Sequence, residues 1–106
     1  MLGFVVKHDI PMGEFRWLTL VSPEEPDGVK LLLEPNQHEA VQTFLTAIKD
    51  DGIQFTSFSV EDIHAEYKRL TKAGVKFTHP PTAASNVTYA TLDDTCGNLI
   101  QIVQLA

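Results

Sequence analysis

The chain has 106 residues, of which 43% are hydrophobic and 21% charged, and this balance is typical of one folded globular domain. Its formal net charge of −6, with eight scattered Lys and Arg residues, disfavours a nucleic-acid partner. No apolar run reaches the roughly 18 residues of a membrane span, and the start lacks the pattern of a signal peptide. We therefore expect no membrane partner and a cytoplasmic location. The single Cys96 excludes an internal disulfide and a Cys-based zinc cluster.

The first third of the chain predicts three strands. Leu2–Lys7 is apolar and β-branched, which favours a strand, and residues 8–14 contain Pro and Gly and are interpreted as a hairpin loop. Arg16–Val21 is the second predicted strand, and residues 22–28, with two prolines and Asp-Gly, form a turn. Val29–Glu34 is the third strand, and its three consecutive leucines predict burial on both faces.

The middle of the chain predicts a strand between two helices. Apolar residues recur at three- and four-residue spacing over Gln37–Asp50, which indicates an amphipathic helix that ends at Gly52. Phe55–Val60 alternates in the manner of a strand. Ile63, Tyr67 and Leu70 then form the apolar stripe of a second helix.

Three more strands are expected after the second helix. Val75–Thr78 is a short strand that residues 79–82, His-Pro-Pro-Thr, are expected to break. Asn86–Leu92 and Leu99–Leu105 are the last two strands. The order after the first helix is therefore β-α-β-β-β, and the order before it is β-β-β. We interpret the chain as α+β, with a shortened module over residues 1–35, a linker helix over 36–52 and a complete module over 53–106.

These pieces, taken in order, resemble the vicinal oxygen chelate superfamily, which contains glyoxalase I, bleomycin-resistance proteins and extradiol dioxygenases. The matching segments are Phe58–Ile63, Tyr67, Leu70, Gly74–Phe77, Tyr89-Ala90, Asp93 and Gly97–Ile102, with Leu2–Phe4 and Leu31–Pro35 in the first half. The resemblance implies two β-α-β-β-β modules whose sheets form an open cup for a ligand. In the family, Leu-Gly-Phe opens the second strand, so its place at residues 2–4 implies that the first strand and helix of module one are absent.

The resemblance also implies where a divalent metal would be held, by one side chain from each of two strands per module. The first ligand would lie on the absent strand, the second at Glu34 or, in another register, at Leu31, the third at Phe55 and the fourth at Gln101. A phenyl ring cannot coordinate, so Glu34 and Gln101 remain as weak candidates. A catalytic divalent site generally needs three protein ligands. We therefore expect no family-type metal and no cofactor.

The residues expected to line the cup and bind a ligand are Trp17, Phe55, Tyr89, Gln101 and His79. Aromatic and apolar side chains with a few polar groups are the usual lining of a small-molecule pocket. On the last strand, Leu99, Gln101 and Val103 share one side and the two isoleucines share the other. The isoleucine side should pack beneath the helices, which directs Gln101 into the cup.

Three hypotheses of function follow. The first is a metal-free small-molecule-binding protein similar to the bleomycin-resistance members. The second is a glyoxalase-like lyase or a dioxygenase whose missing metal ligand comes from a partner chain or from the absent segment. The third is a truncated fragment with a structural role in assembly. An unpaired sheet edge and an uncovered face both favour association, so we also expect a homodimer, with module exchange as one form of it.

Overall fold

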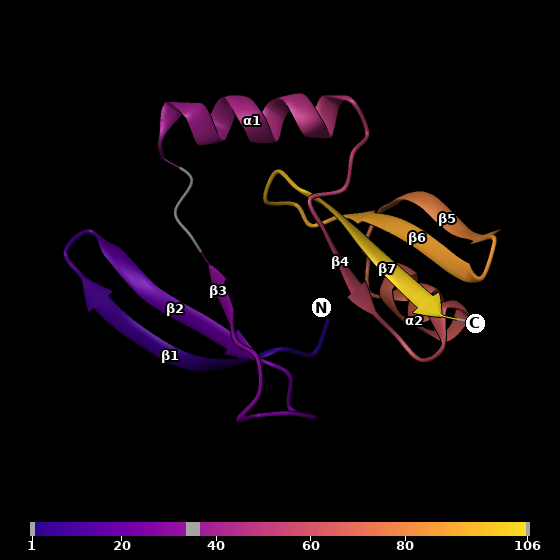
Figure 1. Ribbon diagram of the computed structural model, residues 1–106, viewed down its shortest axis with the longest axis horizontal. Coiled ribbons are helices and arrows are strands. Elements are labelled where there is room, and N and C mark those ends of the chain that lie inside the picture. Colours follow the sequence, from indigo (N-terminus) through magenta and orange to yellow (C-terminus); the bar gives the residue numbers. More distant parts are fainter. Residues whose placement is uncertain (1, 34–36, 106) are drawn as a thin grey trace. The chain divides into compact units, whose positions relative to one another are not determined.

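The computed structural model describes residues 2–33 and 37–105, which form a three-stranded sheet, a four-stranded sheet and two helices (Figure 1). This arrangement confirms the predicted α+β class. The chain divides into two compact units, residues 1–38 and residues 39–106, and each is described by itself below. Within the described ranges, no helix is long and apolar enough to cross a membrane.

The first unit is an antiparallel sheet in the order β1-β2-β3. Its strands are β1 (Val5–Met12), β2 (Phe15–Val21) and β3 (Leu31–Leu33). Gly13, with φ +65°, makes the tight turn between β1 and β2, a conformation that glycine adopts without steric cost. Val21 and Thr19, on β2, are the buried residues of this sheet, at 1% and 2% exposure.

The first strand corrects the hairpin prediction. Residues 8–14 were expected to form a loop, but β1 continues through His8 to Met12, and Pro11 lies opposite Arg16 on β2. The reason is position in the sheet: β1 is an edge strand, where a residue without an N–H removes no interior ladder bond. The strand also begins at Val5 rather than at Leu2.

The third strand is shorter than predicted and less buried. It covers Leu31–Leu33, and the leucines are half-buried or, for Leu33, 44% exposed, so burial on both faces was wrong. β3 lies at the edge of the three-stranded sheet and pairs with β2 alone within it, so its leucines are less covered than predicted. Glu34, the candidate second metal ligand, lies outside the described residues.

The second unit contains the predicted β-α-β-β-β order, preceded by α1. Its elements are α1 (Glu39–Asp50), β4 (Thr56–Ser59), α2 (Ile63–Lys72), β5 (Phe77–Ala84), β6 (Val87–Asp93) and β7 (Leu99–Leu105). The strand order is β4-β7-β6-β5, with β4 parallel to β7 and the other pairs antiparallel. The last strand has the predicted bounds, and α1 and β4 begin one or two residues later than expected.

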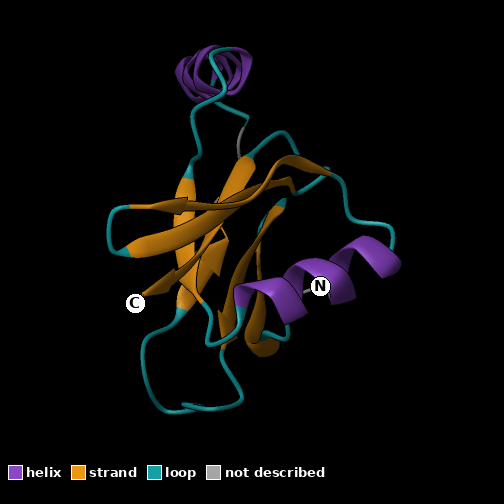
Figure 2. Cartoon of the chain, turned by 90° about the vertical axis from the view of Figure 1, so that its right-hand side faces the viewer, coloured by secondary structure: helices purple, strands orange, loops and turns teal. Residues whose placement is uncertain are grey.

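The core of this unit lies between α2 and the sheet (Figure 2). Ile63 and Leu70 of α2, Leu92 of β6 and Ile102 of β7 are all fully buried. Asp62 begins α2 because its side-chain Oδ1 accepts a hydrogen bond from the backbone N of Ala65 at 3.1 Å. The even-numbered residues of β6 and β7 therefore face α2, as predicted for the isoleucine side of the last strand.

The fifth strand gives the second correction. Residues 79–82 were expected to break it, but β5 runs from Phe77 to Ala84 and includes Pro80 and Pro81. Like β1, β5 is an edge strand, so both prolines are tolerated there. The pairing with β6 shifts register between Phe77 and His79 and again between His79 and Thr82.

Candidate functional site

The candidate site is a pocket of about 480 Å³ on the face of the four-stranded sheet opposite α2. Ala90 and Leu92 of β6 face α2 and are fully buried, so Tyr89, Thr91 and Asp93 point to the other face. The pocket is lined by Lys49, Asp50, Gly52, Gln54, Thr78, His79, Tyr89, Thr91, Asp93 and Leu99. The end of α1 and the loop after it therefore form one wall, and β5, β6 and β7 form the floor.

A bulge in β5 places His79 in this pocket. Phe77 lies opposite Leu92 and packs edge-on against Tyr67 of α2, with ring centroids 4.7 Å apart. In a regular strand, residue 79 would share the face of residue 77. The register shift between Phe77 and His79 reverses this, so His79 lies opposite Thr91 on the pocket face.

His79 stacks on Tyr89 and leaves one polar atom without a partner. Their rings are parallel to within 2°, with centroids 5.1 Å apart. Nε2 of His79 is buried and has no hydrogen-bond partner in the part of the chain that the structure describes. A buried polar atom left unsatisfied costs free energy, and such atoms concentrate at functional sites. The aromatic pair is thus a wall of the pocket that, within the described residues, carries one unpaired polar atom.

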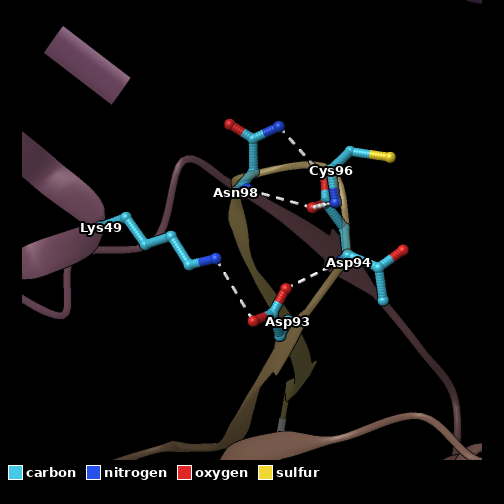
Figure 3. A network of polar contacts seen from close by, with 6 residues as sticks. Lys49, Asp93, Asp94, Cys96 and Asn98 are labelled. Carbon is cyan, nitrogen blue, oxygen red and sulfur yellow. Dashed lines mark hydrogen bonds and ion pairs between the residues drawn. The ribbon is translucent and has the colours of Figure 1, made fainter. Parts of the chain in front are cut away.

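An ion pair links α1 to the edge of the pocket (Figure 3). Nζ of Lys49 lies 3.3 Å from Oδ2 of Asp93, while Oδ1 of Asp93 accepts a hydrogen bond from the backbone N of Thr95 at 2.8 Å. The hydrogen bond from Thr95, followed by the nearby charge of Lys49, lowers the pKa of Asp93 below its ordinary value of 3.8. Asp93 therefore stays ionised and holds Lys49 at the pocket wall.

In the turn that follows Asp93, the side chain of Asp94 accepts hydrogen bonds from the backbone of the turn itself. Oδ1 of Asp94 accepts hydrogen bonds from the backbone N of Cys96 at 2.7 Å and of Asn98 at 3.0 Å (Figure 3). Cys96 itself is exposed. Asp94 thus stabilises the turn between β6 and β7.

A row of polar side chains crosses the pocket face from strand to strand. Ser57 of β4 pairs with Gln101 of β7, Gln101 pairs with Thr91 of β6, and Thr91 pairs with His79 of β5. Oγ of Ser57 donates a hydrogen bond to Oε1 of Gln101 at 2.9 Å. Gln101 is therefore the cross-strand neighbour of a pocket residue, on the face where the sequence placed it.

The family comparison adds to this geometry. A profile of the Glyoxalase/Bleomycin resistance protein/Dioxygenase superfamily matches residues 1–102. The chain belongs to this superfamily. The resemblance inferred from the sequence is thereby confirmed.

A curated relative and two solved structures are also similar to this chain. The protein YurT of Bacillus subtilis (strain 168) is 56% identical over 103 residues, which cover 97% of this chain and 81% of YurT. The solved structure of UcmS2 has a TM-score of 0.76 at 34% identity and covers 96% of this chain and 80% of that one. TnmS3, described as an antibiotic binding protein from Streptomyces sp. CB03234, has a TM-score of 0.72 at 21% identity, with 98% and 77% covered, and shares the fold.

Two of the predicted ligand-binding residues line the pocket of the second unit. His79 and Tyr89 line the pocket, and Gln101 borders it through Thr91. Phe55 precedes β4 and is 53% exposed, outside the pocket lining. Trp17 belongs to the first unit, where it pairs with Ile10 and is 44% exposed.

Other lining residues were not anticipated from the sequence. Thr91 could have been found, because it alternates with Tyr89 along one strand and must share its face. Lys49, Asp50 and Gln54 carry no such signal, since their place in the wall depends on where α1 ends relative to the sheet.

The side chains at which the sequence resemblance implies metal ligands in the second unit, Phe55 and Gln101, do not fit a divalent ion. Phe55 offers no donor atom, and the carboxamide oxygen of Gln101 already accepts the hydroxyl hydrogen of Ser57. Over residues 2–33 and 37–105, no group of three or more His, Cys, Asp and Glu side chains is placed to hold a metal. Phe55 and Gln101 therefore supply no anionic or imidazole donor.

Proposed function

We propose that this protein binds a small organic molecule in the pocket of its second unit and does so without a metal. The observation that carries the proposal is the parallel His79–Tyr89 wall, with an unsatisfied imidazole nitrogen, beside the buried hydroxyl-bearing Thr91. Aromatic surface with a few convergent polar groups is the usual chemistry of a ligand site. The volume of about 480 Å³ suits a molecule of metabolite or drug size.

The superfamily fold supports a choice of probes. TnmS3, which shares this fold, is described as binding an antibiotic. A panel of aromatic metabolites and antibiotics is therefore the first set to test. We expect at least one compound to raise the melting temperature, because a ligand that binds only the folded chain stabilises it by mass action. Absence of any shift across the panel would remove the main support for the proposal.

A pair of isosteric variants locates the binding site. Thr91→Val removes a pocket hydroxyl while keeping the side-chain shape, and we expect it to weaken binding of the best compound by about tenfold. Thr88→Val makes the same change on the same strand, at a residue outside the pocket lining, and serves as the control. Equal affinity of both variants and the wild type would place the ligand elsewhere.

Operation without a metal has a separate test. The purified protein should contain less than about 0.1 equivalent of Ni, Zn, Mn or Fe, because no set of three anionic or imidazole ligands is assembled in the described residues. Elemental analysis measures this directly. A stoichiometric metal that also confers lyase or dioxygenase activity would favour the enzyme alternative instead.

We also propose a homodimer in the cytoplasm. Exposed apolar side chains support association, among them Ile10 and Trp17 on one face of the first sheet and Val41 and Phe44 on α1. Light scattering at micromolar concentration should give twice the mass of one chain. A monomeric mass would contradict the dimer without affecting the pocket.

A further inference from the structure

The pocket runs along β6 from an aromatic end to a charged end. Tyr89, Thr91 and Asp93 alternate along this strand, and all three line the pocket. In an extended strand, Tyr89 and Asp93 are about 13 Å apart. His79 stacks on Tyr89 at one end, and Lys49 pairs with Asp93 at the other. A ligand that uses both ends is therefore elongated, with a ring at one end and a polar head at the other.

The hydrogen-bonding groups left open at the charged end are donors. Oδ1 of Asp93 accepts a hydrogen bond from the backbone N of Thr95 at 2.8 Å, and Oδ2 lies 3.3 Å from Nζ of Lys49 (Figure 3). An ammonium group has three N–H donors, and in the part of the chain that the structure describes Nζ of Lys49 contacts this one carboxylate. Lys49 therefore has N–H groups left for a ligand, whereas both carboxylate oxygens of Asp93 are engaged.

The local charges favour an anionic head at this end. The pKa of Asp93 is lowered first by the hydrogen bond from Thr95 and then by two lysines. These are Lys49 and Lys76, so two ammonium groups act on one carboxylate. Asp50 also lines the pocket, but it is exposed and its charge is screened by water and salt. A ligand carboxylate that joins Lys49 leaves Asp93 with its hydrogen bond from Thr95, and charge-assisted hydrogen bonds are stronger than neutral ones.

We propose that the pocket takes an elongated aromatic acid, with its ring against the His79–Tyr89 wall and its carboxylate on Nζ of Lys49. This inference rests on the proposed small-molecule pocket and specifies the class of ligand that it takes. Lys49 is then a ligand-binding residue, and Asp93 holds its ammonium group at the pocket wall until the ligand shares it.

Two matched pairs of probes test the inference by NMR on the full, ¹⁵N-labelled chain. Phenylhexanoate and phenylhexanol share a terminal ring and a long chain and differ in the head group, and phenylpropanoate and phenylpropanol are the corresponding short pair. We expect phenylhexanoate to bind about fivefold more tightly than phenylhexanol, the contribution of one partly exposed charged contact. The short pair should differ by less than about twofold, because a short acid that lies against Tyr89 cannot reach Lys49.

Three variants separate a ligand contact from structural support of the wall. Lys49→Gln removes the charge and should reduce the preference for phenylhexanoate over phenylhexanol to less than about twofold. Lys72→Gln makes the same change at an exposed residue of α2, outside the pocket lining, and should keep the full preference. Asp93→Asn removes the carboxylate that competes for the ammonium group, and it should raise the preference to about tenfold. A role in holding the wall alone would change the affinities for acid and alcohol by the same factor.

The outcomes distinguish this inference from the proposed function. If the long acid and the long alcohol shift the backbone amides of Tyr89 and Thr91 with equal affinity, the acid class is refuted and the pocket remains. A preference that survives in Lys49→Gln, or that falls in Asp93→Asn, would overturn the role of Lys49. If no probe shifts these amides at millimolar concentration while a compound of the antibiotic and metabolite panel does, the elongated acid is refuted and the binding function stands. If the panel fails as well, both proposals fail.

Discussion

Replacing His79 with phenylalanine should stabilise the protein and weaken ligand binding at the same time. The variant keeps an aromatic ring to stack on Tyr89 and removes the buried Nε2 that has no partner in the described chain. Residues that serve binding are commonly not the best choice for stability, whereas residues that serve packing are. Opposite changes in stability and affinity would therefore mark His79 as a binding residue.

The magnitude follows from the cost of an unsatisfied polar atom. Leaving a buried donor or acceptor unpaired costs about 1–3 kcal/mol. We expect the His79→Phe variant to recover roughly 1 kcal/mol, the low end of this range, because His79 is only half-buried. The extra ring atom of phenylalanine can project toward the pocket rather than into the α2 core. For a unit of this size, that gain raises the melting temperature by about 4–8 °C.

Circular dichroism at 222 nm is the appropriate assay, because α1 and α2 both lie in the second unit. Fluorescence of Trp17, the single tryptophan, reports on the first unit and is recorded beside it. His64→Phe is the control, since His64 is exposed on α2 and the same substitution there should change stability by less than about 0.5 kcal/mol. A His79→Phe variant less stable than the wild type by 1 kcal/mol or more would show that Nε2 is satisfied, and the reasoning would be wrong.

Two further predictions concern charges in the second unit. The pKa of Asp93 in the folded chain lies below its ordinary value of 3.8, chiefly because of the hydrogen bond from Thr95 and then because of Lys49. These contacts stabilise the folded chain fully at pH values above 3.8, and their contribution is lost as the pH falls through the lowered pKa of the folded state. Melting temperature should therefore fall less steeply below about pH 4 in Asp93→Asn than in the wild type; parallel curves would contradict this. Asp62→Ala, which removes the cap on Ala65, should cost about 1 kcal/mol in urea unfolding followed at 222 nm, and Glu61→Ala should cost much less. Equal losses in these two variants would show that capping is not the cause.

The prolines show where local sequence rules fall short. Pro11, Pro80 and Pro81 were taken as breaks, yet all three lie within strands. Proline removes one backbone donor, and whether that matters depends on whether a neighbouring strand would have accepted from it. β1 and β5 are both sheet edges, and edge position is a property of the assembled sheet.

Some residues of the candidate site could be placed by local sequence rules and others could not. Alternation along single strands was enough to separate Gln101 from Ile100 and Ile102, because side-chain direction has a strict period of two. Alternation along β5 could not have placed His79, because the bulge after Phe77 inserts a residue and reverses the face. The half-exposed Phe55 shows that a residue next to the correct strand need not line the pocket.

By itself, the sequence determined the α+β class and the β-α-β-β-β order of the second unit, since both depend on local periodicity and turn chemistry along the chain, and its resemblance to known members indicated the superfamily. Only the tertiary structure decided which strands are edges, which side chain stacks on Tyr89 and that Lys49 of α1 reaches Asp93 of β6. Those outcomes depend on pairing between residues distant in sequence, and no local pattern encodes such pairing.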